Sequence, residues 1–203
     1  MTDVIDFKDN AELLLNPELE GELRTGKGTA YGLELLVRKN DGKLNGWVSY
    51  TLSSTTRKVA EINNGKSYRA PYDKPHNISI VLNYELNERM LISANWVYAT
   101  GAPVTFPTGR AIVGNVILPI YSDRNAYRLP DYHRLDLAFT LKSKMKENRK
   151  WQGEWNFSVY NAYARKNAWS INFEQDVDNP MRTYAVKTYL FSIIPAITYN
   201  FKF

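Results

Sequence analysis

"PAITYNFKF" (Pro195–Phe203) closes the chain, and apolar and polar side chains alternate along it up to the final residue. Such a period of two residues is that of a β-strand, in which successive side chains point to opposite faces of a sheet. Chain ends usually fray, so a strand pattern kept to the last position predicts that this end is paired. The two parities are Ile197, Tyr199, Phe201 and Phe203 against Thr198, Asn200 and Lys202.

The same alternation recurs upstream, and the chain reads as about seven strands of about ten residues each. Every segment has one aliphatic and aromatic face and one polar face. The other segments are 29–39, 44–53, 76–86, 90–100, 133–142 and 153–163, and 168–175 is a candidate extension.

Connections between these segments alternate in length. Asp41-Gly42 is a tight hairpin signal, and Asn87-Glu88 marks a second short turn. Long polar stretches follow the second, fourth and sixth segments, and the basic linker Lys142–Lys150 joins the fifth to the sixth. This rhythm predicts an up-and-down antiparallel sheet with all of its long loops at one rim.

Composition leaves a membrane barrel open. The 203 residues are 44% hydrophobic and 13% aromatic, with a formal net charge of +5 and no cysteine. Absence of cysteine excludes disulfides and thiolate chemistry, and no apolar run approaches the roughly 18 residues of a transmembrane helix. A mean hydropathy of −0.43 does not argue against a β-barrel, which hides its apolar residues at alternate positions.

Strand length and aromatic placement favour the membrane. Ten residues at ~3.3 Å each, tilted by ~40°, span about 25 Å, which matches the apolar band of an outer-membrane barrel. A soluble β-sandwich has strands of about five or six residues. Aromatic girdles are expected at both interfaces: Tyr31, Trp96 and Tyr98 at the long-loop rim, and Tyr84, Phe201 and Phe203 at the other.

The fold class expected is therefore all-β: an antiparallel up-and-down transmembrane β-barrel segment of about 7–8 strands, with long extracellular loops and short periplasmic turns. An eight-stranded closed barrel stays open as an alternative if the N-terminal segment or residues 168–175 add a strand; its interior would hold side chains only. As a function, this alternative is a stand-alone small outer-membrane barrel or an adhesin-like structural or binding protein without transport. A soluble β-sheet binding module is the third interpretation.

Six segments in order resemble the C-terminal barrel strands of TonB-dependent outer-membrane receptors of Bacteroidetes-type bacteria. The likeness runs from about Glu18 to Phe203. The segments are "GKGTAYGLELLVRKNDGKLNGWVSYTLS", "YDKPHNISIVLNYELNER", "ISANWVYATGAPVTFPTGR", "RLPDYHRLDLAFTLK", "GEWNFSVYNAYARKN" and "IIPAITYNFKF".

This resemblance implies part of a 22-stranded barrel that holds a plug domain and imports a scarce nutrient (siderophore, cobalamin, glycan or peptide) with energy relayed by TonB. Tyr199, Phe201 and Phe203 match the C-terminal signal read by the barrel-assembly machinery. No plug, TonB box or signal peptide is found in the sequence. We therefore expect residues 1–28 to be the remnant of an extracellular loop and residues 29–203 to be C-terminal strands of the barrel.

Two sets of candidate site residues follow. Charges on the polar parity are expected to line the lumen or contact a plug: Glu34, Arg38, Glu85, Arg134, Asp136 and Glu154. Aromatic and arginine side chains in the long stretch 101–130 are candidate ligand contacts at the outer mouth: Phe106, Arg110, Tyr121, Arg124, Tyr127 and Arg128.

Other chemistry is not indicated. His76 and His133 share the parity of the apolar residues and lack a third metal ligand at fitting spacing, so interfacial packing is the expectation for both. No nucleophile elbow is present. We expect no enzyme activity, no catalytic or metal site, no cofactor and no nucleic-acid partner. The partners expected are the outer-membrane bilayer, the barrel-assembly machinery, and a plug and TonB system in a full-length protein. The cell outer membrane is the expected location.

Overall fold

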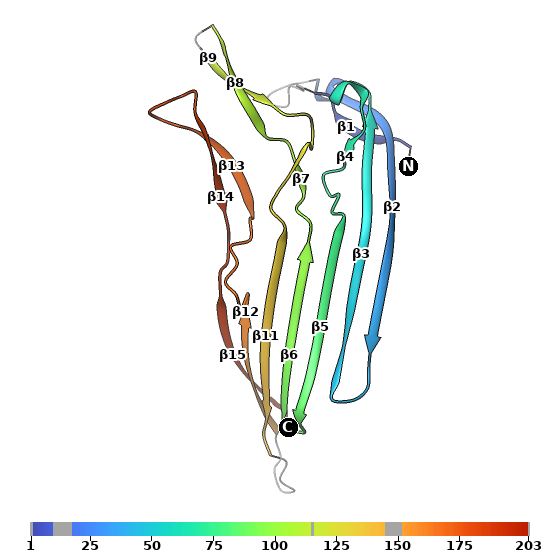
Figure 1. Ribbon diagram of the computed structural model, residues 1–203, viewed down its shortest axis with the longest axis vertical. Coiled ribbons are helices and arrows are strands. Elements are labelled where there is room, and N and C mark those ends of the chain that lie inside the picture. Colours follow the sequence, from blue (N-terminus) through green and yellow to red (C-terminus); the bar gives the residue numbers. More distant parts are fainter. Residues whose placement is uncertain (1, 10–17, 115, 145–151, 203) are drawn as a thin grey trace.

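The computed structural model describes residues 2–9, 18–114, 116–144 and 152–202. One long antiparallel sheet dominates the molecule, and its strands run along the long axis (Figure 1). Its strands, in spatial order, are β1 (Val4–Phe7), β2 (Leu23–Lys39), β3 (Leu44–Val59), β5 (His76–Asn87), β6 (Met90–Ala99), β11 (Tyr132–Lys142), β12 (Gln152–Tyr160) and β15 (Ile194–Lys202), with β4 (Tyr68–Arg69) beside β3.

Each of the seven segments expected as a strand is confirmed, and the strands pair with their neighbours in chain order. The sheet extends further at one end than the apolar pattern indicated. β2 begins at Leu23 rather than at 29, and β3 ends at Val59 rather than at 53. Polar residues such as Thr55 and Thr56 continue the ladder because they pair with β2 and have good β-propensity. Residues 1–28, expected as a loop, contain β1, the 3₁₀ turn η1 (Leu19–Glu22) and the start of β2.

Three small sheets are built from the long connections. β7 (Pro103–Val104) pairs with β10 (Tyr127–Arg128), β8 (Pro107–Val113) with β9 (Val116–Tyr121), and β13 (Ser170–Gln175) with β14 (Thr183–Thr188). Residues 168–175, considered as a further strand, do contain the strand β13, but it pairs with β14 in a separate sheet. The N-terminal segment, the other candidate for an added strand, contributes β1 to the main sheet. η2 (Asn63–Gly65) lies in the connection after β3.

The long connections all lie at one end of the sheet and the short turns at the other. Figure 1 places the hairpins β8–β9 and β13–β14 at the upper end, whereas the β2–β3 turn, the β5–β6 turn and the C-terminus lie at the lower end. The rim asymmetry inferred from the loop lengths is thus present in the fold. Phe203 and residues 145–150 of the basic linker lie outside the described residues.

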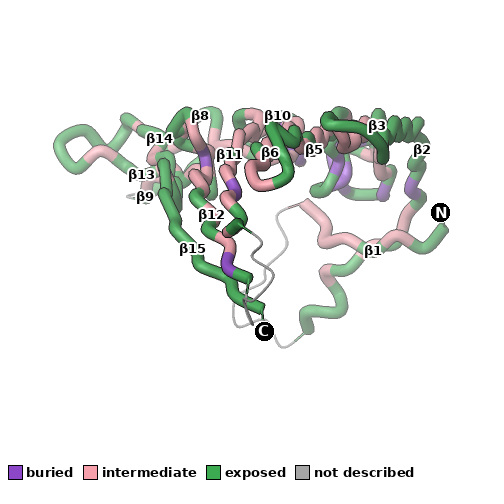
Figure 2. The backbone as a smooth tube through the Cα atoms, turned by 90° about the horizontal axis from the view of Figure 1, so that it is seen from below, coloured by how far each residue is buried: buried purple, intermediate pink, exposed green. Residues whose placement is uncertain are grey.

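The main sheet is curved and open. Seen from below it forms an arc with β2 and β15 at its two ends (Figure 2). Within the described residues these two strands do not pair with each other, so no closed barrel is formed. The N-terminal segment that carries β1 lies inside the arc (Figure 2), against the face that bears the polar side chains.

Few of the described residues are buried. The buried apolar residues described are Val59, Ile62, Tyr68 and Ala70, all at the upper end where β3, η2 and β4 meet the N-terminal segment. Within the ranges that the structure describes, no other cluster of buried apolar residues lies against the sheet. Among the described residues, no helix has the length and apolarity needed to cross a membrane.

Candidate functional site

Register places the apolar residues of neighbouring strands on one face of the sheet. Cross-strand partners lie about 4.5–5.5 Å apart, so these side chains form continuous rows. Three successive rows are Val48–Ile80–Trp96–Leu135, Leu82–Ala94–Leu137–Val159–Pro195, and Tyr84–Ile92–Phe139–Phe157–Ile197. We call this surface the apolar face. Its continuity confirms that neighbouring strands direct their apolar side chains to the same face of the sheet.

No described element covers the apolar face. Leu137 in β11 is 40% exposed and Phe157 in β12 is 41% exposed, although both lie in the middle of the sheet. A contiguous apolar surface of this extent is rare on a soluble monomer and marks a contact with membrane or protein. The surface therefore requires an apolar partner.

Aromatic side chains gather at both ends of the apolar face. At the upper end Trp96 and Tyr98 stack, with ring centroids 6.2 Å apart, and Tyr50 stacks on His76. At the lower end Trp155 contacts Tyr199 with a centroid distance of 4.6 Å. Aromatic rings thus border the aliphatic rows at both ends of the apolar face, in an upper and a lower belt.

Each histidine belongs to the upper belt and pairs with a tyrosine. Nδ1 of His76 lies 2.9 Å from the Tyr50 hydroxyl, and Nδ1 of His133 lies 2.7 Å from the Tyr163 hydroxyl. Among the described residues, no group of three or more His, Cys, Asp or Glu side chains is placed to hold a metal ion.

The opposite, polar face is joined by side-chain hydrogen bonds across strands. Asn83 donates to Asn45 at 3.2 Å and accepts from Ser93 at 2.7 Å, and Asn156 donates to Thr140 at 2.9 Å. These contacts satisfy amides and hydroxyls that would otherwise face one another unpaired. The polar face can therefore line water.

The six charges predicted for the polar parity all lie in the main sheet, and two of them form a pair. Arg134 and Asp136 make an ion pair at 2.8 Å, and Arg134 also donates to the Tyr132 and Tyr160 hydroxyls. The Arg134 guanidinium lies over the Tyr160 ring, 4.1 Å from its centroid. The other four have no side-chain partner among the described residues: Glu34, Arg38, Glu85 and Glu154.

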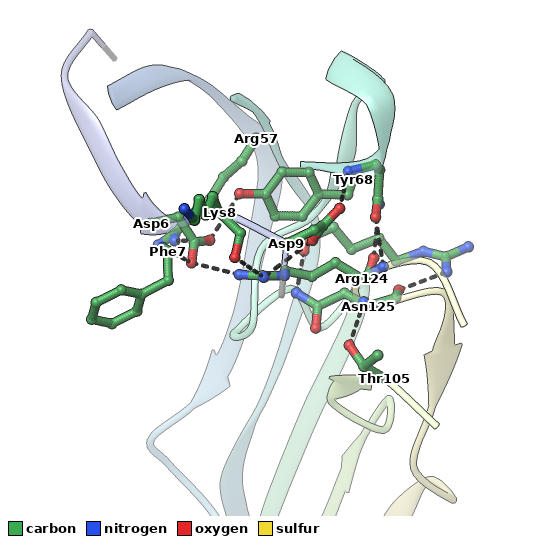
Figure 3. Close-up of polar contacts among 11 residues, drawn as sticks. Asp6, Phe7, Lys8, Asp9, Arg57, Tyr68, Thr105, Arg124 and Asn125 are labelled. Atoms are coloured by element: carbon green, nitrogen blue, oxygen red, sulfur yellow. Dashed lines mark hydrogen bonds and ion pairs between the residues drawn. The ribbon is translucent and has the colours of Figure 1, made fainter. Parts of the chain in front are cut away.

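A polar cluster ties the N-terminal segment to the upper end of the sheet (Figure 3). The Asp6 carboxylate accepts from Arg124 at 2.9 Å, from the Tyr68 hydroxyl at 2.8 Å and from Arg57 at 3.3 Å. Burial and the negative Asp6 carboxylate together raise the pKa of the Tyr68 hydroxyl. Asp6 thus joins β1, β3, β4 and the loop after β9.

Arg124, in the loop after β9, lies at the centre of the same cluster. Its guanidinium also meets Asp9 at 3.2 Å, and its backbone amide donates to the Asn63 side chain at 2.7 Å. β1 reaches this position because it pairs with β2, with Val4 opposite Gly26. Gly26 is required there, since a Cβ would lie 2.4 Å from the Lys58 carbonyl oxygen.

The six candidate ligand contacts lie together at the upper end, but the arginines are engaged within the chain. Arg110 donates to Thr183 Oγ1 at 2.8 Å, Arg124 is held by Asp6 and Asp9, and Arg128 pairs with the buried carboxylate of Asp73.

The aromatic candidates differ in exposure. Phe106 packs between Tyr127 and Phe173, with centroids 5.6 Å and 4.7 Å away. Tyr121 is 60% exposed and lines a cleft of about 790 Å³ between the N-terminal segment and the base of the β8–β9 hairpin. Of the six candidates, Tyr121 and Tyr127 present the most surface for contact with a bound molecule.

Sequence reasoning missed the acidic partners in these loops. Asp6 and Asp9 fall in the segment read as a loop remnant, and Asp73 and Asp131 fall in stretches read as polar connections. Asp131 accepts from the Tyr98 hydroxyl at 2.6 Å and from the Gly101 amide at 2.9 Å, and these hydrogen bonds lower the pKa of its carboxyl. The signal of pairing that the sequence offered was the presence of both arginines and aspartates in these stretches.

Comparisons with known proteins found no family model that matches the chain and no significant match to a curated protein or a solved structure.

Proposed function

We propose that this chain forms the C-terminal strands of the β-barrel of a TonB-dependent outer-membrane receptor, which takes up a scarce nutrient such as a siderophore, a cobalamin, a glycan or a peptide. The observation that carries the membrane part of the proposal is the uncovered apolar face bounded by two aromatic belts. Lipid is the partner that covers such a surface on all of its strands at once.

The height of the band fits a bilayer. On β11, the upper belt lies at His133 and the lower belt lies beside Leu141, opposite Trp155. Eight residues at ~3.3 Å each, tilted by ~40°, cover about 20 Å along the membrane normal. With the belts themselves added, the band approaches the ~25 Å apolar height of outer-membrane barrels.

Strand direction indicates that the sheet needs further strands to close. β2, β5, β11 and β15 run toward the short-turn end, and their antiparallel neighbours run back. Because β2 and β15 run in the same direction, pairing them directly would give a parallel contact. Closure as an antiparallel barrel needs an odd number of further long strands between these edges. One such strand would close an eight-stranded barrel and a larger odd number a larger barrel, so strand direction is compatible with both interpretations.

The polar face and the upper loops support the receptor part. Four charges of the polar face have no side-chain partner in the described chain, which supports a role for them in contacting a plug domain. The loops at the upper end are organised by ion pairs around Asp6 and Asp73, so they present a defined surface rather than loose chain. Loops positioned by a rigid scaffold are where binding residues are commonly found.

Vesicle flotation tests the membrane part. The chain refolded with phospholipid vesicles is expected to float with them after an alkaline carbonate wash and to show β-type circular dichroism. A chain that stays monomeric in plain buffer and does not float would contradict it.

Growth tests the transport part. Removing β15 from the gene in its host is expected to abolish growth on one limiting nutrient among iron chelates, cobalamin, glycans and peptides. Inactivating the TonB system should reproduce that defect. Unchanged growth under all of these conditions would contradict a role in uptake while leaving the membrane result unaffected.

A further inference from the structure

On β2 and β3 the apolar face gives way to polar side chains toward the upper end. Continuous pairing between the two strands fixes which side chains are neighbours. Going upward, the rows on this side are Leu33–Leu52, Tyr31–Ser54, Thr29–Thr56 and Lys27–Lys58. The surface therefore passes from aliphatic to phenol and hydroxyl groups, and then to two ammonium groups.

Lys27 and Lys58 are directly opposed, and like charges in that position destabilise a sheet. Both side chains are exposed, and neither has an acidic partner among the described residues. The inward neighbour of Lys58 is Val59, which is buried, so the lysines are held on the outer side of the sheet. A shared anion between them would relieve this repulsion.

The height of the pair matches the headgroup layer. Lys27 lies four residues above Tyr31, which was expected in the upper aromatic girdle. This separation is ~13 Å along the strand, or about 10 Å along the membrane normal for a strand tilted by ~40°. Lysine stems lie back along apolar surface and place the ammonium near the interface. The hydroxyls of Thr29 and Thr56 lie directly below as further donors.

We infer that Lys27 and Lys58, with Thr29 and Thr56, form a binding surface for the phosphate of an anionic lipid headgroup in the leaflet that surrounds the long-loop end. The inference rests on the proposed membrane placement of the apolar face. Lipid is the source indicated because the four residues continue that face without a break, so an acyl chain lying along Leu33 and Leu52 places its phosphate beside them.

Vesicle partitioning of the full chain tests the inference. Binding is measured to vesicles of phosphatidylcholine alone and to vesicles that also contain phosphatidylglycerol, for the wild type and for the double variant Lys27→Gln/Lys58→Gln. A matched double variant, Arg182→Gln/Lys187→Gln, removes two exposed positive charges from the β13–β14 hairpin. The first double variant is expected to lose about thirty-fold of the preference for anionic vesicles, and the matched variant is expected to keep it.

The possible outcomes separate this inference from the proposed function. Equal losses in both double variants, or no loss in either, would overturn the headgroup surface while insertion stands. Failure of the wild type to bind either kind of vesicle would overturn both. If inorganic phosphate at matched ionic strength abolishes the preference of the wild type, the surface takes free phosphate rather than a headgroup, and the inference about lipid is wrong.

Discussion

A single charge placed in the middle of the apolar face provides a sharp test of the lipid contact. Leu137 lies halfway along β11 between the two aromatic belts, four residues from His133 and four from Leu141. Its cross-strand neighbours, Ala94 and Val159, are small enough to leave room for a longer side chain. Leu137→Arg therefore places a guanidinium at the expected midplane of the bilayer.

The expected loss in free energy of unfolding follows from the exposure of Leu137 and from its depth in the bilayer. Leu137 is 40% exposed, and burying a whole leucine is worth about 2–3 kcal/mol, so the lipid-covered part contributes about 1 kcal/mol. Arginine on the lipid face at the midplane costs a further ~2–4 kcal/mol. The sum is about 3–5 kcal/mol in free energy of unfolding. The same change on a surface in water would usually stay within about 0.5 kcal/mol.

The assay is denaturant unfolding of the chain from phospholipid vesicles, followed by tryptophan fluorescence. Ala138→Arg is the matched control, since Ala138 is the next residue of β11 and faces the polar side between Ser93 and Ser158. We expect the control to lose less than about 1 kcal/mol, as for a hydrated site. Equal losses in the two variants, or no loss in Leu137→Arg, would refute the reasoning.

Three further predictions concern the upper loops. Asp6→Asn should lower the local stability of β1 by about 3 kcal/mol, because Arg57 loses its carboxylate and Arg124 loses one of its two. Faster amide hydrogen exchange in β1 would show it, and Asp3→Asn should have no effect. Arg128→Ala should cost about 3 kcal/mol in denaturant unfolding because it leaves the buried Asp73 carboxylate unpaired, and adding Asp73→Asn should restore part of this; no recovery in the double variant would contradict the pairing. The pKa of the Asp131 carboxyl is lowered in the fold, so the ionised carboxylate stabilises the fold at pH values above its unfolded pKa of about 3.9. This stabilisation is lost as the pH falls below that value, and hydrogen exchange at the Gly101 amide should then accelerate. An Asp131→Asn variant that kept the same pH dependence would count against this.

Sequence reasoning located the seven long strands because each keeps a strict two-residue period over about ten residues. It also found the rim at which the long loops lie, since connection length is visible without any contact information. The polar extension of β2 and β3 was missed because an exposed strand end has no apolar alternation, and its pairing depends on the facing strand.

The upper loops were beyond the reach of pattern reasoning. Asp6 and Arg124 are 118 residues apart in sequence, and nothing local to either one indicates the other. The short strands β7 to β10 and β14 also depend on pairing within irregular stretches, where propensity is overridden by tertiary contact. The alternation in residues 168–175 indicated β13 but not its partner β14. Arg124 was expected to contact a ligand, and the structure places it in a cluster with Asp6 and Asp9.

Spin labels placed along β11 give the most direct measurement of whether the apolar face meets lipid. The chain has no cysteine, so single cysteines introduced at positions 133–141 can each be labelled alone in vesicles and probed with oxygen and with a water-soluble nickel chelate. The account predicts a period of two, with oxygen access at Leu135, Leu137 and Phe139 and chelate access at Asp136 and Ala138. Chelate access at Leu135, Leu137 and Phe139, or low access to both probes there, would contradict it.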